Sequence, residues 1–158
     1  MATTLTIAPE YGYVLLTASL TTLNAFWHGG RISAFRKAAG LSYPTPYADS
    51  AHLSAASTDP SKKQALYLFN CAQRAHGNFL ENQTTLLTTM LVSGVQYPLV
   101  AAGLGLVWNL GRVVYAVGYT RADQSNGKGR LVGSFFWFAQ LGLIGLTGWT
   151  GGKIAGLV

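Results

Sequence analysis

The segment from Pro98 to Tyr119, "PLVAAGLGLVWNLGRVVYAVGY", contains a single charged residue, Arg112. A helix that crosses a membrane needs roughly 20 mostly apolar residues, because its backbone polar groups find no water in lipid and must bond within the helix. Proline suits the first turn of a helix, where its missing N–H does no harm. The segment therefore predicts a membrane-spanning helix that begins at Pro98.

The composition of the whole chain agrees with a membrane protein. Of its 158 residues, 49% are hydrophobic and only 10% are charged, and the mean hydropathy is positive. Three further segments are long enough and apolar enough to form helices of the same kind. Their expected ranges are about 11–36, 63–94 and 131–152. We therefore predict an all-α fold, an integral membrane four-helix bundle that forms one domain over residues 1–158.

The formal net charge of +6 gathers in two of the three connections between these helices. The basic residues of the first and third connections are Arg36, Lys37, Lys62, Lys63, Arg121, Lys128 and Arg130. Basic connections tend to stay in the cytosol. We therefore expect these two connections to be cytosolic and both termini to lie on the opposite side. Because topology explains the charge, we expect no nucleic-acid partner.

Small residues recur in the third and fourth predicted helices, for example in "AAGLGL" (101–106). In lipid, small residues let helices approach each other closely. The predicted bundle is slender and has a large lipid-exposed circumference. A homo-oligomer would hide polar helix faces at its subunit contacts, and we therefore expect one.

Polar residues interrupt the second predicted helix within "FNCAQRAHGNFLENQ", from Phe69 to Gln83. At about 100° per residue, one stripe of this helix holds Asn70, Arg74, Asn78, Glu81, Thr85 and Thr88. His76 and Gln83 point almost the opposite way. An ionised side chain at membrane depth costs several kcal/mol unless it is paired or wet, and is therefore a candidate functional residue. The alternative is that Arg74 and Glu81 hold other helices together.

A second polar cluster follows in "RVVYAVGYTR" (112–121), where Arg112, Tyr115 and Tyr119 share one face of the third helix. Arg36 and Arg130 are expected at the same cytosolic level. A single structural ion pair does not need so many cationic donors. The two clusters therefore predict a small anionic ligand with more than one carboxylate.

Other chemistries have less support. The three histidines, His28, His52 and His76, lie on different segments and few acids are available, so we expect no metal site. Cys71 is the only cysteine, which excludes an intramolecular disulfide. No serine or cysteine has a credible histidine and carboxylate set for a nucleophilic triad. An ion pathway would need polar residues through the whole membrane, and the fourth helix offers almost none.

Three stretches, "RKAAGLSYPTPYA" (36–48), "FNCAQRAHGNFLE" (69–81) and "GLGLVWNLGRVVYAVGY" (103–119), resemble the membrane-associated eicosanoid and glutathione metabolism (MAPEG) family. Within it, they look most like the type-three microsomal glutathione S-transferases. The resemblance implies a four-helix membrane bundle that forms homotrimers. It also implies that glutathione, a co-substrate, binds between neighbouring subunits near the cytosolic face. The thiol would attack hydrophobic electrophiles or lipid hydroperoxides that reach it from the membrane lipid.

The resemblance also implies roles for single residues. Those expected to hold glutathione within one subunit are Arg74, Asn78, Glu81, Tyr115 and Tyr119. Arg36 and His76 occupy positions from which a neighbouring subunit contributes in similar proteins. Arg130 is expected to face the thiol and favour the thiolate. Arg121 is the alternative, because the register across "TRADQSNGKGR" is open.

The favoured function is a microsomal glutathione transferase with glutathione-dependent peroxidase activity. Conjugation and peroxide reduction share the thiolate, so the sequence does not rank them. Phe135, Phe136 and Phe138 are candidates to line the electrophile's apolar path, with core packing or lipid contact as the alternative. The alternative function is a non-enzymatic lipid-binding accessory protein of the same fold. The expected membrane is the endoplasmic reticulum, with the mitochondrial outer membrane as the alternative.

Overall fold

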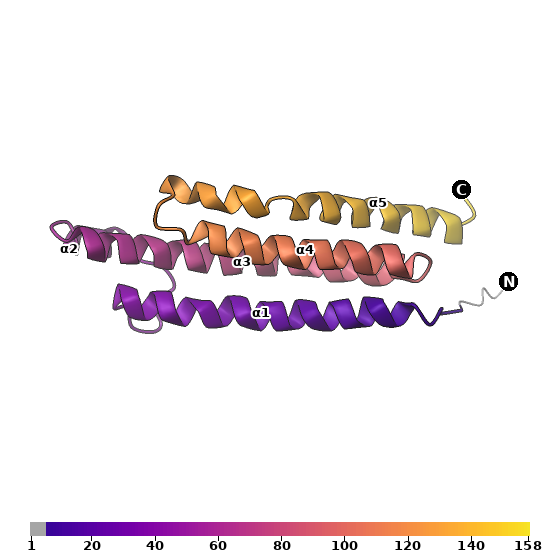
Figure 1. Cartoon of the computed structure of the whole chain (residues 1–158), viewed down its shortest axis with the longest axis horizontal. Coiled ribbons are helices and arrows are strands. Elements are labelled where there is room, and N and C mark those ends of the chain that lie inside the picture. Colours follow the sequence, from indigo (N-terminus) through magenta and orange to yellow (C-terminus); the bar gives the residue numbers. More distant parts are fainter. Residues whose placement is uncertain (1–5) are drawn as a thin grey trace.

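The computed structural model describes residues 6–158, and all regular structure within that range is helical. The elements are α1 (Tyr11–Ala39), α2 (Ser50–Ala55), α3 (Pro60–Gly94), α4 (Pro98–Tyr119), the 3-10 helix η1 (Ser125–Gly133) and α5 (Phe136–Ile154). The four long helices form an elongated bundle (Figure 1). The C-terminus and the first described residues lie at one end, and α2 and η1 lie at the other. The predicted all-α fold class is confirmed.

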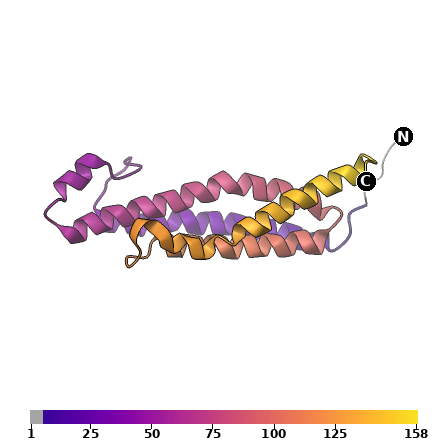
Figure 2. The ribbon, with the colours of Figure 1, turned by 90° about the horizontal axis from the view of Figure 1, so that it is seen from above.

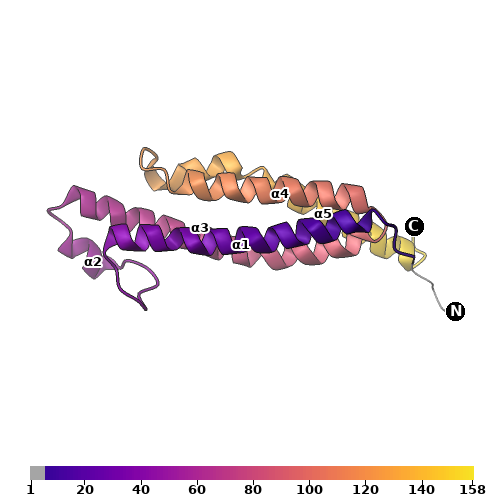
Figure 3. The ribbon, with the colours of Figure 1, turned by 60° about the horizontal axis from the view of Figure 1, so that its bottom comes forward.

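Helices α3 and α4 form the middle of the bundle. On one side α1 packs against both of them, and on the other side α5 does so. Figure 2 shows that α5 runs obliquely across the bundle, and Figure 3 shows α1 lying along α3 on the opposite side. This arrangement leaves the outward faces of α1 and α5 uncovered in a single protomer.

The helix ends follow from local chemistry. The Asp59 side chain accepts hydrogen bonds from the backbone N–H groups of Ser61 and Lys62, both at 3.0 Å, so it caps the start of α3. Gly40 ends α1 in the left-handed conformation with φ of 59°, which a glycine adopts without steric cost. The connection between them also contains α2, a short helix that the sequence analysis did not predict.

Close backbone contacts hold η1 against α4. A Cβ atom at Gly118 would collide with the carbonyl oxygen of Gly129, and one at Gly133 would collide with the backbone nitrogen of Tyr115. Only glycine permits this approach at these positions. As a result, η1 and the arginine that it carries, Arg130, are fixed relative to α4.

The largest part of the core lies between α3, α4 and α5. Its fully buried side chains include Phe79, Leu86, Met90, Trp108, Phe136 and Leu143. Phe136 therefore belongs to the core, as the core-packing alternative expected, and does not line a surface path within the protomer. Phe138 is 80% exposed and remains available to line one.

Polar residues point inward on α1 while apolar residues point outward. Thr21, Asn24 and His28 are buried, whereas Leu23 and Phe26 are exposed. This is the reverse of the pattern that a surface helix shows in a water-soluble protein. An outward apolar face of this kind suits contact with lipid or with another subunit.

Among the described residues, α4 is the one helix that is long enough and apolar enough on its own to cross a membrane. The pair η1 and α5 passes the same test together and is bent by 50° between its two parts. The inward polar residues of α1 and the polar stripe of α3 lower the hydropathy of those two helices. By helix length and hydropathy, the described residues therefore contain fewer candidate membrane spans than the four helices that the sequence predicts.

Candidate functional site

The polar stripe of α3 forms a hydrogen-bonded group at its centre. Arg74 Nη1 donates to Glu81 Oε1 at 2.7 Å, and Asn78 Nδ2 donates to Glu81 Oε2 at 3.3 Å. The spacing of these three residues places them on one face of the helix, as predicted. The Arg74 and Glu81 side chains are 49% and 53% exposed, so a ligand can reach both.

Arg112 on α4 extends this group into the bundle. It is fully buried, and its Nη1 donates to Asn78 Oδ1 at 2.9 Å. Within residues 6–158, its Nε and Nη2 have no hydrogen-bond partner. Its Cζ lies 4.4–5.8 Å from the ring centroids of Phe79, Trp108, Tyr115 and Phe136. Aromatic faces stabilise a buried cation only in part, so unused donors remain beside the α3 group.

The sequence places Arg112 in the second polar cluster, three and seven residues before Tyr115 and Tyr119, but assigns it no contact with glutathione. Those spacings place all three side chains on one helix face. Its hydrogen bond to Asn78 on α3 does not follow from this spacing, because it depends on how α3 and α4 pack.

Two tyrosines connect Arg112 to Arg130. The Arg112 Cζ lies 4.6 Å from the Tyr115 ring centroid, and the Tyr115 and Tyr119 rings lie 5.6 Å apart in an edge-to-face arrangement. The Arg130 Cζ lies 5.1 Å from the Tyr119 ring centroid. Contacts thus run without a break from Arg74 on α3 to Arg130 on η1.

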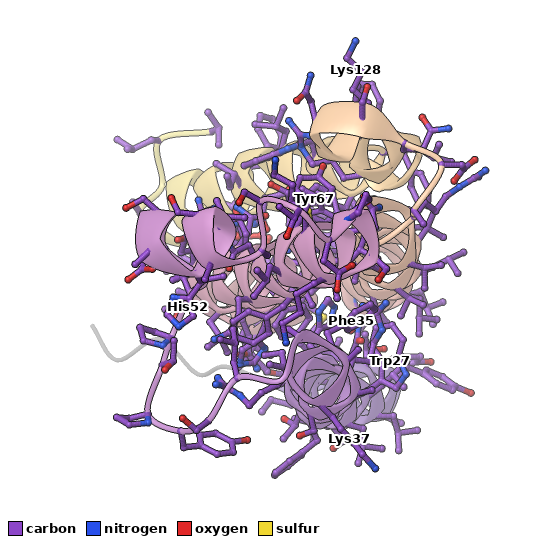
Figure 4. All side chains as sticks on the ribbon, turned by 90° about the vertical axis from the view of Figure 1, so that its left-hand side faces the viewer. Trp27, Phe35, Lys37, His52, Tyr67 and Lys128 are labelled. Atoms are coloured by element: carbon purple, nitrogen blue, oxygen red, sulfur yellow. The ribbon has the colours of Figure 1, made fainter. Side chains whose placement is uncertain are left out.

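Backbone groups of η1 orient the Arg130 side chain. Its Nη1 donates to the carbonyl oxygens of Asn126 and Gly127 at 3.0 and 2.8 Å. Tyr67 on α3 accepts a hydrogen bond from the Gly127 N–H at 2.6 Å, which ties η1 to α3. Figure 4 looks onto this end of the bundle, with Tyr67 near its middle and Lys128 pointing outward. The Arg130 guanidinium is therefore held in a defined position.

Arg121 has a different environment. It forms an exposed ion pair with Asp123, with 2.6 Å between Arg121 Nη2 and Asp123 Oδ2. The hydrogen bond from Arg121 lowers the pKa of the Asp123 carboxyl to about 2. Because its charge is already matched by a neighbouring carboxylate, Arg121 is less suited than Arg130 to stabilise a ligand anion.

We refer to Arg74, Asn78, Glu81, Arg112, Tyr115, Tyr119 and Arg130 together as the cationic cluster. It contains three guanidinium groups and one carboxylate. Arginine remains protonated at any physiological pH, so the cluster has an excess of positive charge. Such a group can bind carboxylates and favour the ionised form of a nearby acid.

Arg36 lies outside the cationic cluster of its own protomer. It is buried at the end of α1, where its Nη1 donates to the carbonyl oxygens of Ser42 and Thr45 at 3.3 and 2.7 Å. Its Cζ lies 4.3 Å from the ring centroid of Tyr43 and 4.8 Å from that of Phe69. Within the protomer, this arginine orders the connection between α1 and α3.

His76 also lies apart from the cationic cluster, on the face of α3 that packs against α1. Its ring centroid is 6.5 Å from that of the buried His28. Its Nδ1 is buried and has no hydrogen-bond partner in the described part of the chain. The different directions of Arg74 and His76 agree with the helix spacing. Within the described residues, no group of His, Cys, Asp and Glu side chains gathers that could hold a metal ion.

The family model for the MAPEG family matches residues 14–149. This chain belongs to the MAPEG family. The match extends from the first turn of α1 to the last part of α5 and includes every residue of the cationic cluster. The MAPEG family is membrane-associated and includes glutathione transferases and related proteins, most of which use glutathione.

Proposed function

We propose that this MAPEG protein is a glutathione transferase that also reduces lipid hydroperoxides with glutathione. The observation that carries the proposal is the excess of guanidinium groups over carboxylates in the cationic cluster. Glutathione has two carboxylates, one ammonium group and one thiol. A site with three cations, one anion and two phenols complements these groups.

The half-exposed pair on α3 binds the charged ends of the tripeptide. Arg74 binds a carboxylate, and Glu81 binds the ammonium group. Their mutual ion pair orients both side chains before the ligand arrives. Asn78 fixes the Glu81 carboxylate from one side and accepts a hydrogen bond from Arg112. The buried Arg112 charge adds a long-range attraction for the anionic ligand.

Arg130 acts on the thiol. A free thiol with a pKa near 8.5 is mostly protonated at neutral pH, and the thiolate is the nucleophile. A cation within about 4–6 Å favours the charged form by one or more pKa units, each about 1.4 kcal/mol. The η1 carbonyl groups hold Arg130 through Nη1, and within the described residues its other nitrogens have no hydrogen-bond partner and can face the sulfur.

The thiolate then attacks one of two kinds of substrate. With an electrophile, a carbon–sulfur bond forms and the displaced electron pair leaves with the leaving group or moves to the adjacent heteroatom. With a hydroperoxide, sulfur attacks the outer oxygen, the O–O bond breaks, and protonation releases an alcohol. The resulting glutathione sulfenic acid reacts with a second glutathione to give the disulfide and water. Both routes use the same ionised sulfur.

We further propose that the protein spans the membrane as a homotrimer of four-helix bundles, of the type-three microsomal subgroup. The support is the inverted polarity of α1, whose apolar outer face suits lipid or a subunit contact. Arg36 and His76 then contribute to the site of a neighbouring subunit. The end with α2 and η1 faces the cytosol, the opposite end faces the lumen of the endoplasmic reticulum, and Phe138 lies on the electrophile's path.

The test is a binding and activity assay on the full-length protein purified in detergent. Glutathione binding is measured directly, and turnover is measured with a chromogenic electrophile and with cumene hydroperoxide. We expect glutathione binding and turnover of both substrates. Folded protein that binds lipid and no glutathione would overturn the proposal and favour the accessory function.

A further inference from the structure

The connection between α1 and α3 returns onto the surface of α3 beside the cationic cluster. Asn70 and Ala48 exchange two hydrogen bonds: the Ala48 N–H donates to Asn70 Oδ1 at 2.8 Å, and Asn70 Nδ2 donates to the Ala48 carbonyl oxygen at 2.8 Å. Gln73 Nε2 also donates to the carbonyl oxygen of Pro46. We refer to residues 42–48 as the docked segment.

The other end of the docked segment is held by Arg36. Its hydrogen bonds to the carbonyl oxygens of Ser42 and Thr45, and its stacking on Tyr43, fix the first residues of the segment against α1. Both ends of the docked segment are thus attached to long helices. A short connection that is fixed at both ends presents its side chains in a defined direction.

Tyr47 lies between two residues that α3 holds, Pro46 and Ala48. Its hydroxyl group lies 3.9 Å from the point that a Cβ atom would occupy at Gly77, and Arg74 Nη1 lies 3.9 Å from the same point. The phenol and the guanidinium therefore both lie close to Gly77, which has no side chain of its own to occupy that position. The Tyr47 side chain is 44% exposed, and its hydroxyl makes no hydrogen bond within residues 6–158.

We propose that Tyr47 is a further glutathione-binding residue, whose hydroxyl donates a hydrogen bond to the carboxylate that Arg74 binds. The inference rests on the proposed function and adds a ligand contact from the docked segment, residues 42–48, where the sequence predicts none. A phenol is a suitable second donor, because a guanidinium leaves carboxylate lone pairs free and the phenol adds no charge. Asn70 is then a positioning residue, since it fixes the backbone next to Tyr47.

The test compares Y47F with the unmodified protein, both full-length and in detergent. Phenylalanine keeps the ring and removes only the hydroxyl. We expect the Kd and KM for glutathione to rise about tenfold, which corresponds to about 1.4 kcal/mol, while kcat at saturating glutathione stays the same. The matched control is Y43F, in the same docked segment, whose ring stacks on Arg36. This control should leave both constants unchanged.

Glutathione analogues identify the contact. In each analogue, one of the two carboxylates is replaced by an amide. The analogue that lacks the carboxylate bound by Arg74 cannot accept the Tyr47 hydrogen bond in the same way. The unmodified protein and Y47F should therefore bind this analogue with equal affinity. A tenfold difference that persists with both analogues would overturn the carboxylate contact.

A second variant tests the positioning role. N70L should weaken glutathione binding by itself and should add nothing in the Y47F background, since both changes remove the same contact. Fully additive losses would overturn this role. Unchanged glutathione binding in Y47F, beside clear binding in the unmodified protein, would overturn the inference and leave the proposed function intact. Absence of binding in the unmodified protein would overturn both.

Discussion

Two groups of polar side chains lie along α4, and they differ in how completely their donors are used. Around Asn109, the Asn24 Nδ2 donates to Asn109 Oδ1 at 3.1 Å, and Asn109 Nδ2 donates to Thr21 Oγ1 at 2.8 Å and to the Gly105 carbonyl oxygen at 2.9 Å. This amide group is neutral, and each of its amide nitrogens is bonded. Arg112, three residues further along, is charged, and within residues 6–158 only one of its three nitrogens has a hydrogen-bond partner.

The difference separates structure from ligand binding. A neutral network whose amide donors are all paired joins α1 to α4 and has no amide donor left for an anion. A charged group with unused donors is costly to bury, and it attracts an anion. The Asn109 group thus holds helices together, whereas Arg112 in the cationic cluster keeps donors that are unpaired within residues 6–158.

The largest expected effect is that of Arg130→Ala. Without this cation the thiol of bound glutathione titrates one to two pKa units higher, so kcat at neutral pH should fall about 10- to 100-fold. Because the thiolate is the reactive form, the deficit should shrink as the pH rises above the new thiol pKa. Steady-state kinetics from pH 6 to 10 measure both effects.

Arg121→Ala is the matched control for this change. It removes an arginine from the same connection, but one that already pairs with Asp123. We expect its kcat and pH profile to match those of the unmodified protein. A loss of activity in Arg121→Ala with none in Arg130→Ala would assign the thiol contact to Arg121.

A smaller effect is expected for Arg74→Ala. It removes a charged hydrogen-bond donor to the ligand and releases Glu81. The KM for glutathione should rise about tenfold, with little change in kcat. Arg74→Lys keeps the charge but loses the planar geometry, so it should recover only part of the affinity. A fall in kcat with an unchanged KM would contradict the binding role.

The smallest effect is expected for Asn109→Leu, which breaks the neutral network. Interhelical hydrogen bonds in membranes contribute about 0.6 kcal/mol on average and rarely more than about 1.7 kcal/mol. We therefore expect a small decrease in thermal stability in detergent and an unchanged Kd for glutathione. A loss of affinity as large as that of Arg74→Ala, without any loss of stability, would contradict the distinction between the two groups.

Local patterns carried much of the prediction of this fold. The helix start at Pro98 and the common face of Arg74, Asn78 and Glu81 both follow from short-range rules, and the structure has both. The last helix illustrates the limit. Its expected start near residue 131 is replaced by η1, and α5 begins at Phe136, because glycine contacts with α4 impose a tighter backbone there.

The remaining features of the site depend on packing between distant segments. Arg112 reaches Asn78 only because α3 and α4 lie side by side, and Tyr47 lies near Arg74 only because Asn70 holds the docked segment. No residue spacing encodes these contacts. Helical periodicity predicts which residues share a face of one helix, but it does not predict which other segment packs against that face.

The most direct test of the account is the titration of the thiol of bound glutathione. Ultraviolet absorbance of the thiolate is recorded against pH for the protein saturated with glutathione, with Arg130→Ala as the comparison. We predict a pKa at least about one unit below the free value of about 8.5 and a return towards that value in Arg130→Ala. A bound thiol that titrates at or above the free value in the unmodified protein would contradict the account.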